Sequence, residues 1–141
     1  MCRFILLVLA VMAMGRSMQR FLRTDRECIS HTAVSLAGYG DCVGAATRAQ
    51  AALAKRASSQ AKIALADLDQ QGGGDPTCVS LLASYESAAK DVISSTEAMA
   101  TAEQQGHDAR AYAIDHQVYP ALQTFQRVAG PLIDGCGLIL T

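Results

Sequence analysis

Catalysis in proteins depends mostly on histidine, cysteine and acidic side chains, so we looked first for these residues in catalytic arrangements. Asp115 and His116 form an adjacent acid and imidazole pair, with Tyr119 close by. Such a pair within a helix is more typical of a helix surface than of a general base. The chain contains neither a Gly-x-Ser-x-Gly nor a His-Glu-x-x-His motif. The sequence therefore predicts a protein that is not an enzyme.

Metal and phosphate sites are not predicted either. A zinc site needs two close pairs of Cys or His ligands. Cys28-x-x-His31 has that spacing, but His107 and His116 lie nine residues apart. The Gly72–Gly74 run lacks the Gly-Lys-Ser/Thr that completes a phosphate-binding loop, which favours a turn between two helices. We expect no cofactor and no metal ion.

The N-terminal segment has the features of a secretory signal peptide. Arg3 precedes an apolar run of eleven residues over 4–14, which is shorter than the roughly 20 residues of a membrane span. Ala13-x-Gly15 supplies the small residues of a cleavage site. We expect cleavage near Gly15 and secretion of the mature chain. Because four arginines follow closely, an uncleaved anchor or a buried N-terminal helix is the alternative.

Export changes the interpretation of the cysteines. Cys2 leaves with the signal peptide, and four cysteines remain at positions 28, 42, 78 and 136. An even number of cysteines in an oxidising compartment predicts disulfides. Four cysteines allow three connectivities, and the shortest loop, between Cys28 and Cys42, is the easiest to close.

Composition and charge indicate a helical protein that does not bind nucleic acid. The chain has 141 residues, of which 25 are Ala and only 5% aromatic. Alanine loses no side-chain entropy in a helix, whereas strands favour β-branched and aromatic residues. The net charge is −1, but residues 16–62 carry +5 and residues 63–141 carry −7. Either the helices of the two halves pair through complementary charges, or the acidic half binds a cationic partner.

Periodicity and turn residues predict the helices. A helix over 45–71 stops at the glycine run, and Asp75-Pro76 begins a second helix that reaches Gly106. A third helix runs from His107 or Asp108 to Val128, with a kink at Pro120. The second helix carries an apolar stripe with heptad-like spacing, formed by Leu82, Tyr85, Ala89, Val92, Thr96 and Met99.

These helices predict an all-α protein, an up-and-down four-helix bundle whose fourth helix is short. Gly130-Pro131 is expected to end the third helix, and the apolar segment 132–140 supplies the fourth. We expect three regions: the signal peptide over 1–15, an N-terminal extension over 16–44, and the helical bundle domain over 45–141.

Two segments around cysteines carry a further pattern. They are Tyr39-Gly40-Asp41-Cys42 and Thr77-Cys78-Val79-x-Leu81-x-x-x-Tyr85-x-x-Ala88. Both resemble the plant invertase and pectin methylesterase inhibitor family, whose members are secreted four-helix bundles with an N-terminal helical hairpin closed by a Cys pair. The resemblance implies that a Cys28–Cys42 disulfide closes a helical hairpin formed by the extension.

The chain also departs from the family pattern. The family bonds the equivalent of Cys78 to a Cys four residues before a Phe, and Phe125 places Ala121 at that position. Cys78 and Cys136 therefore either pair with each other or both stay free. The Pro-Lys-Phe element with which invertase inhibitors enter the sucrose pocket is absent, which favours pectin methylesterase as the target.

The resemblance implies an extracellular inhibitor of a cell-wall enzyme, pectin methylesterase rather than acid invertase, that occludes the substrate cleft by reversible, non-covalent binding. A contact surface is predicted opposite the apolar stripe of the second helix, at Ser84, Ser87, Asp91 and Ser94. A merely solvated face is the alternative interpretation of these residues.

The alternative functions are a non-inhibitory secreted bundle with a structural or signalling role, and a ligand-carrying bundle. We expect a protein partner, no membrane contact after cleavage, and a homodimer if the short fourth helix leaves an apolar stripe uncovered.

Overall fold

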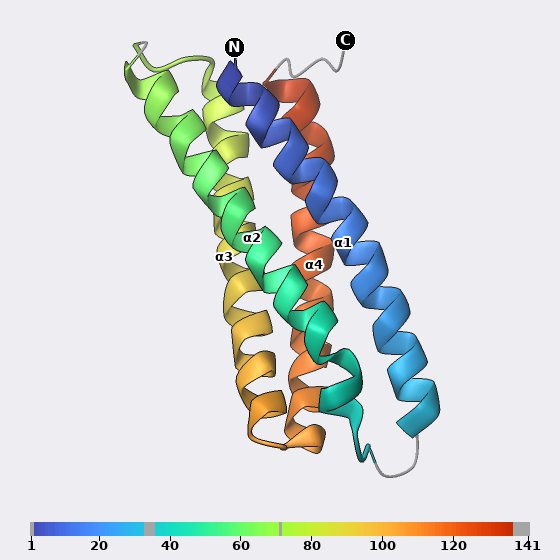
Figure 1. Ribbon diagram of the computed structural model, residues 1–141. Coiled ribbons are helices and arrows are strands. Elements are labelled where there is room, and N and C mark those ends of the chain that lie inside the picture. Colours follow the sequence, from blue (N-terminus) through green and yellow to red (C-terminus); the bar gives the residue numbers. More distant parts are fainter. Residues whose placement is uncertain (1, 33–35, 71, 137–141) are drawn as a thin grey trace.

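The computed structural model describes residues 2–32, 36–70 and 72–136, and all regular structure within them is helical. The four helices of these ranges are α1 (Cys2–Thr32), α2 (Tyr39–Gln70), α3 (Pro76–Gln104) and α4 (Asp108–Gly135). Figure 1 shows that consecutive helices run in opposite directions. We call the end at which α1 leads to α2 and α3 leads to α4 the lower end, as drawn there, and the opposite end the upper end.

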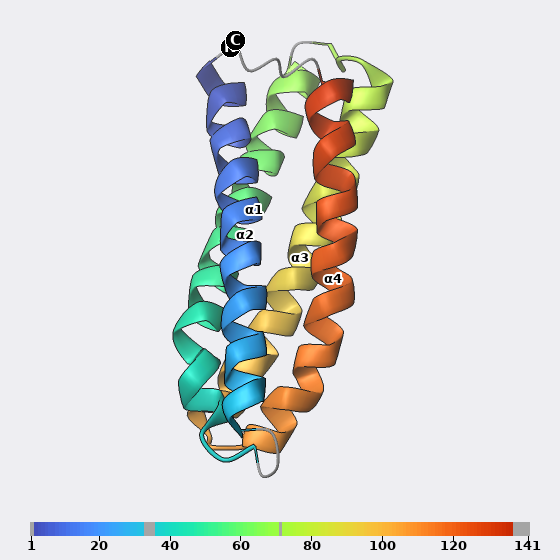
Figure 2. The ribbon, with the colours of Figure 1, turned by 90° about the vertical axis from the view of Figure 1, so that its right-hand side faces the viewer.

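The helices pack in chain order, and α2 packs against α3 as extensively as the helices of the α1/α2 and α3/α4 pairs pack against each other. Helix α2 lies along both α1 and α3, and α4 lies along α3, whereas α1 and α4 approach each other at only a few residues. Figure 2 shows α1 beside α2 and α3 beside α4. Small side chains permit the close approach of α2 to its neighbours, because its buried positions include Ala54, Ala57, Ala61 and Ala64.

The predicted apolar stripe of α3 is confirmed, since all six of its residues are buried. The aromatic rings of Tyr85 and Phe125 meet across α3 and α4 with their centroids 4.6 Å apart. Burial of such rings contributes strongly to stability, because each removes a large apolar area from water. The stripe therefore joins the α3/α4 pair along most of its length.

Turn chemistry sets the helix ends that the sequence predicted. Gly72, Gly73 and Gly74 all have positive φ, a conformation that glycine adopts without steric cost. Asp75 accepts a hydrogen bond from the backbone N–H of Thr77 at 3.0 Å, with Pro76 as the first helical residue. The predicted turn and the predicted start of α3 are both confirmed.

Helix α2 begins six residues earlier than expected, at Tyr39 rather than residue 45. The Asp108 carboxylate, from the start of α4, accepts hydrogen bonds from the backbone N–H groups of Gly38 and Gly40. This carboxylate satisfies donors that a helix N-terminus otherwise leaves unpaired. The cap comes from a residue far away in the sequence, so local sequence patterns could not reveal it.

The prediction of a short fourth helix after Gly130-Pro131 is wrong. Helix α4 continues through both residues to Gly135 and contains Pro120 and Pro131. A proline inside a helix removes one hydrogen bond, and here the buried Leu132 and the disulfide at Cys136 hold the last turn against α3. Residues 137–140 of the predicted segment lie outside the described residues.

The fourth helix is instead supplied by the N-terminal part of the chain. Residues 16–32 form the second half of α1, and residues 39–44 form the first turns of α2, so the expected separate hairpin extension is part of the same helix pair. The apolar residues before Gly15 belong to α1 as well, and Leu7 and Met14 are fully buried. Across the described ranges, no helix combines the length and the apolar character needed to cross a membrane.

Candidate functional site

The predicted contact residues lie on one exposed line along α3. Ser84, Ser87, Asp91 and Ser94 are all exposed. Their spacing of three and four residues places them on the same side of the helix. A shallow groove between α3 and α4 borders this line and is lined by Asp91, Ser94, Ser95, Gln117, Pro120, Ala121 and Thr124.

Cysteines 28, 42, 78 and 136 form two disulfides. Cys28 is bonded to Cys42 across the junction of α1 and α2, and Cys78 is bonded to Cys136 across the start of α3 and the end of α4. Ala121, which stands where the resembled family has its fourth Cys, lines the groove instead. Each helix pair therefore has its own covalent link, one at the lower end and one at the upper end. Disulfides of this kind are typical of oxidising, extracellular-type environments.

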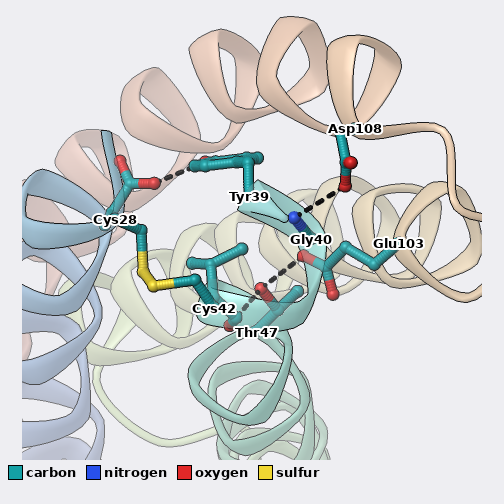
Figure 3. The surroundings of a disulfide bond; sticks show 9 residues. Cys28, Tyr39, Gly40, Cys42, Thr47, Glu103 and Asp108 are labelled. Carbon is teal, nitrogen blue, oxygen red and sulfur yellow. Dashed lines mark hydrogen bonds between the residues drawn. A yellow bond between two sulfur atoms is a disulfide. The ribbon is translucent and has the colours of Figure 1, made fainter. Parts of the chain in front are cut away.

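A cluster of buried polar side chains lies beside the Cys28–Cys42 disulfide, and the sequence analysis did not identify it as a cluster. Figure 3 shows Tyr39, Thr47 and Glu103 near this disulfide. Tyr39 donates a hydrogen bond to Oδ1 of Asp25 at 2.5 Å, and Tyr119 donates one to Oδ2 at 2.9 Å. Because Asp25 and Tyr39 are fully buried, these bonds connect α1 to α2 and to α4 inside the protein.

Two further contacts join the helix pairs at the lower end. The hydroxyl of Thr47 on α2 donates to Oε1 of Glu103 on α3 at 2.8 Å, and Asp108 caps α2 as described above. Both are drawn in Figure 3. A Cβ on Gly40 would lie 2.9 Å from Asp108 Oδ1 and 3.2 Å from Glu103 Cα, so only glycine fits there without displacement. Glycine at position 40 therefore permits the close approach of α2 to the α3/α4 connection.

Asp115 lies inside the protein, which corrects part of the surface-pair interpretation. Its neighbour His116 is exposed and packs its ring against Tyr112 at a centroid distance of 4.9 Å. Asp115 is 0% exposed, and neither of its carboxylate oxygens has a hydrogen-bond partner among the residues that the structure describes. One side chain is buried and the other is exposed, and no hydrogen bond joins them, so they do not form an acid–imidazole pair.

Burial changes the protonation of this cluster. Burial, followed by the nearby Asp25 carboxyl, raises the pKa of Asp115 to about 8. Burial also raises the pKa of Glu103 to about 7, against the opposing effects of Thr47 and Arg48. The charged form of a carboxyl is disfavoured when it leaves water, because the protein interior solvates charge poorly. Both acids therefore keep a proton at pH values where exposed carboxyls are ionised.

The buried cluster connects helices rather than presenting reactive groups to a substrate. Asp25, Asp115 and Glu103 are each less than a tenth exposed. A catalytic acid must reach its substrate directly or through one water molecule, and these groups do not lie at the surface. Nowhere in 2–32, 36–70 or 72–136 do three or more Cys, His, Asp or Glu residues have an arrangement that could hold a metal ion.

A second groove, between α1 and α2, was also missed by the sequence analysis. Small side chains line it on α2, among them Ala45, Ala46 and Ala49, and Arg16 and Arg20 line it on α1. The dense arginines after the apolar run were the available signal, but their position beside a groove depends on how α1 packs on α2.

Opposite charges also pair between the helices: Lys55 of α2 and Glu97 of α3 lie 2.7 Å apart. That contact agrees with the complementary-face interpretation of the charge asymmetry.

Comparison with known proteins adds no relative of this chain. No family model, curated protein or solved structure matches it. The resemblance to the inhibitor family therefore depends on the cysteine, tyrosine and alanine positions quoted above. The functional conclusions below rest on those positions and on the geometry of the helices.

Proposed function

We propose that the protein is a secreted inhibitor of a cell-wall carbohydrate-active enzyme, with pectin methylesterase as a better candidate target than acid invertase. In this proposal the folded chain binds reversibly and without covalent chemistry, and it occludes the substrate cleft of its target. It acts as an up-and-down four-helix bundle in the extracellular space of a plant cell wall.

The observation that carries the proposal is the exposed polar line on α3 beside the α3/α4 groove. Ser84, Ser87 and Ser94 are small, so another protein surface can approach α3 closely along them. Asp91 adds a negative charge at the edge of the groove. Binding by a rigid surface loses less conformational entropy than binding by a mobile one. The Cys78–Cys136 disulfide supports this argument because it ties the two helices that form the groove.

Export supports the proposal through the cysteines and the N-terminal segment. Two disulfides are stable in an oxidising compartment, and the first residues have the signal-peptide pattern. The Tyr and Ala that follow Cys78 at the family spacing support an inhibitor over other secreted bundles. The alternative is a non-inhibitory secreted bundle with a structural or signalling role.

Inhibition assays test the proposal directly. Purified disulfide-bonded protein is titrated into a pectin methylesterase and, separately, into an acid invertase. We expect inhibition of the methylesterase that reverses on dilution. Activity of both enzymes that is unchanged at micromolar protein would overturn the inhibitor proposal and favour the structural or signalling alternative.

Matched variants then locate the contact. Ser87→Trp places a bulky ring on the proposed surface, and Gln19→Trp places the same ring on an exposed position of α1. We expect Ser87→Trp to raise the inhibition constant at least about tenfold, which corresponds to about 1.4 kcal/mol. We expect Gln19→Trp to inhibit like the parent. Equal inhibition by both variants would exclude the α3 surface as the contact.

A further inference from the structure

The carboxyl group of Asp25 is the point at which three helices meet. It lies on α1 and accepts hydrogen bonds from Tyr39 of α2 and Tyr119 of α4. Elsewhere α1 and α4 make few contacts, so the bond from Tyr119 is a direct link between the two helix pairs. A change in the charge of this cluster is therefore expected to strengthen or weaken the contact between α1 and α4.

Asp115 adds a second carboxyl to the same buried space. It is 0% exposed, and its oxygens find no hydrogen-bond partner within the described part of the chain. An ionised carboxylate in such a place is costly because it lacks solvent, and the nearby Tyr39 hydroxyl, which favours the charged form, does not offset the effects of burial and of Asp25. A protonated Asp115 is neutral and can donate its proton toward Asp25, whose carboxyl lies close enough to interact with it. Protonation therefore removes the cost of a buried charge and gives the Asp115 carboxyl a hydrogen-bond partner.

The groups that face this pair are mostly acids or hydroxyls. Helix α2 contributes Tyr39, α3 contributes Glu103 and α4 contributes Tyr119. The nearby cations lower the pKa of other groups. Arg26 of α1 lowers that of Tyr119, and Arg48 of α2 lowers that of Glu103. Two negative charges on Asp25 and Asp115 would repel each other in a region of low dielectric constant. A proton on Asp115 removes that repulsion.

We propose that Asp115 holds a proton beside the carboxyl of Asp25 and that this cluster forms a pH-sensitive connection between α1 and α4, intact in acid and weakened as the pH rises. The connection is regulatory in kind, and it does not depend on the inhibitor function proposed above. It adapts the fold to an acidic surrounding.

The direction of the pH effect follows from proton linkage. In the unfolded chain an aspartate titrates at about 3.9 and a glutamate at about 4.3. In the folded protein the pKa of Asp115 is about 8 and that of Glu103 about 7. Folded protein therefore binds more protons than unfolded protein between these limits. The stabilisation is fully present below about pH 4 and is lost as the pH rises through about 7 to 8.

Urea unfolding between about pH 4 and pH 9 measures this loss. For each proton held only by the folded state, the folding equilibrium constant falls about tenfold per pH unit within the window. We expect the parent protein to lose stability over this range. Asp115→Asn, which imitates the neutral acid, is expected to lose less stability than the parent, and its remaining loss is expected from Glu103. Asp134→Asn, an exposed change on the same helix, serves as the control and is expected to follow the parent.

Infrared spectroscopy gives a second readout that does not depend on the stability of any variant. The folded parent at about pH 6 is expected to show carbonyl absorption from the protonated carboxyls of Asp115 and Glu103, and Asp115→Asn is expected to lose the Asp115 contribution while keeping that of Glu103. Amide hydrogen exchange, compared between parent and variant at the same pH, locates the effect: we expect the parent to exchange faster than Asp115→Asn at the lower end above about pH 8. A parent whose stability is constant or rises with pH, or protonated-carboxyl absorption that is the same in the parent and in Asp115→Asn, would overturn the proposal.

Discussion

The two ends of the protein are held together by different physical means. The upper end is mainly apolar, with Leu7, Leu82 and Leu132 fully buried, and its disulfide joins α3 to α4. The lower end contains the two buried acids whose pKa is raised, Glu103 and Asp115, together with Asp25 and the hydroxyls that donate to it, and its disulfide joins α1 to α2. The stability gained from apolar burial does not depend on pH, whereas the contribution of a buried acid changes when the acid titrates. The lower end is therefore expected to respond to a change in pH more strongly than the upper end.

Removal of residues 1–15 tests the upper end and is expected to have the largest effect. The truncated chain starts at Arg16 and loses the buried side chains of Leu7, Val8, Val11 and Met14. Each fully buried side chain of this size contributes about 1.5–3 kcal/mol. We expect a lower urea midpoint and binding of a hydrophobic dye to the uncovered face of α2.

The same experiment bears on export. Mass spectrometry of protein secreted from plant cells shows whether signal cleavage occurs near Gly15. If it does, the cleaved form is the one to compare with the full chain. Equal urea midpoints and no dye binding would show that the first half of α1 contributes nothing to stability.

The two disulfides are expected to differ in their contribution. Cys78 and Cys136 are separated by 58 residues, and Cys28 and Cys42 by 14. Loop-closure entropy assigns about 4 kcal/mol to the longer loop and about 3 kcal/mol to the shorter one. Replacing each pair by serine and measuring the free energy of unfolding tests this order. A larger loss from the Cys28/Cys42 pair would mean that its contacts with the polar cluster outweigh loop length.

A single substitution at the lower end removes the hydrogen bond from Tyr119 of α4 to Asp25 of α1. Tyr119→Phe deletes the hydroxyl that donates to Asp25 at 2.9 Å. A hydrogen bond to a charged group contributes about 1.5–3 kcal/mol, and we expect the lower limit because Tyr119 is only half-buried. Tyr112→Phe keeps the ring contact with Tyr39 and serves as the matched control. A cost equal to that of the control would show that the bond adds no stability.

Substitutions at two glycines, one in α1 and one at the lower end, are expected to change stability least. Gly15 lies within α1, and a Cβ there would have nothing within 4 Å, so Gly15→Ala is expected to stabilise the full chain by about 0.5–1 kcal/mol. Gly40 at the lower end is crowded by Asp108 and Glu103, so Gly40→Ala is expected to destabilise it. Thermal unfolding of both variants measures the difference. Stabilisation by Gly40→Ala would contradict the close approach of α2 to the α3/α4 connection.

The sequence by itself determined the helical class, the apolar stripe of α3 and the turn between α2 and α3. These features depend on local physics: alanine content, the helical period and the backbone freedom of glycine. The exposed positions of Ser84, Ser87, Asp91 and Ser94 follow from the same period. Whether they bind a partner is a separate question, to which the inhibition assays apply.

Only the tertiary structure decided where the remaining polar residues go. Asp25, Glu103 and Asp115 are far apart in the sequence and meet because three helices bring them to the lower end. Asp108 caps a helix that starts 69 residues before it, at Tyr39. The continuation of α4 through Gly130-Pro131 also depends on packing, which outweighs the local preference to stop. Long-range contacts of this kind leave no periodic signal, because their partners are set by the packing of whole helices.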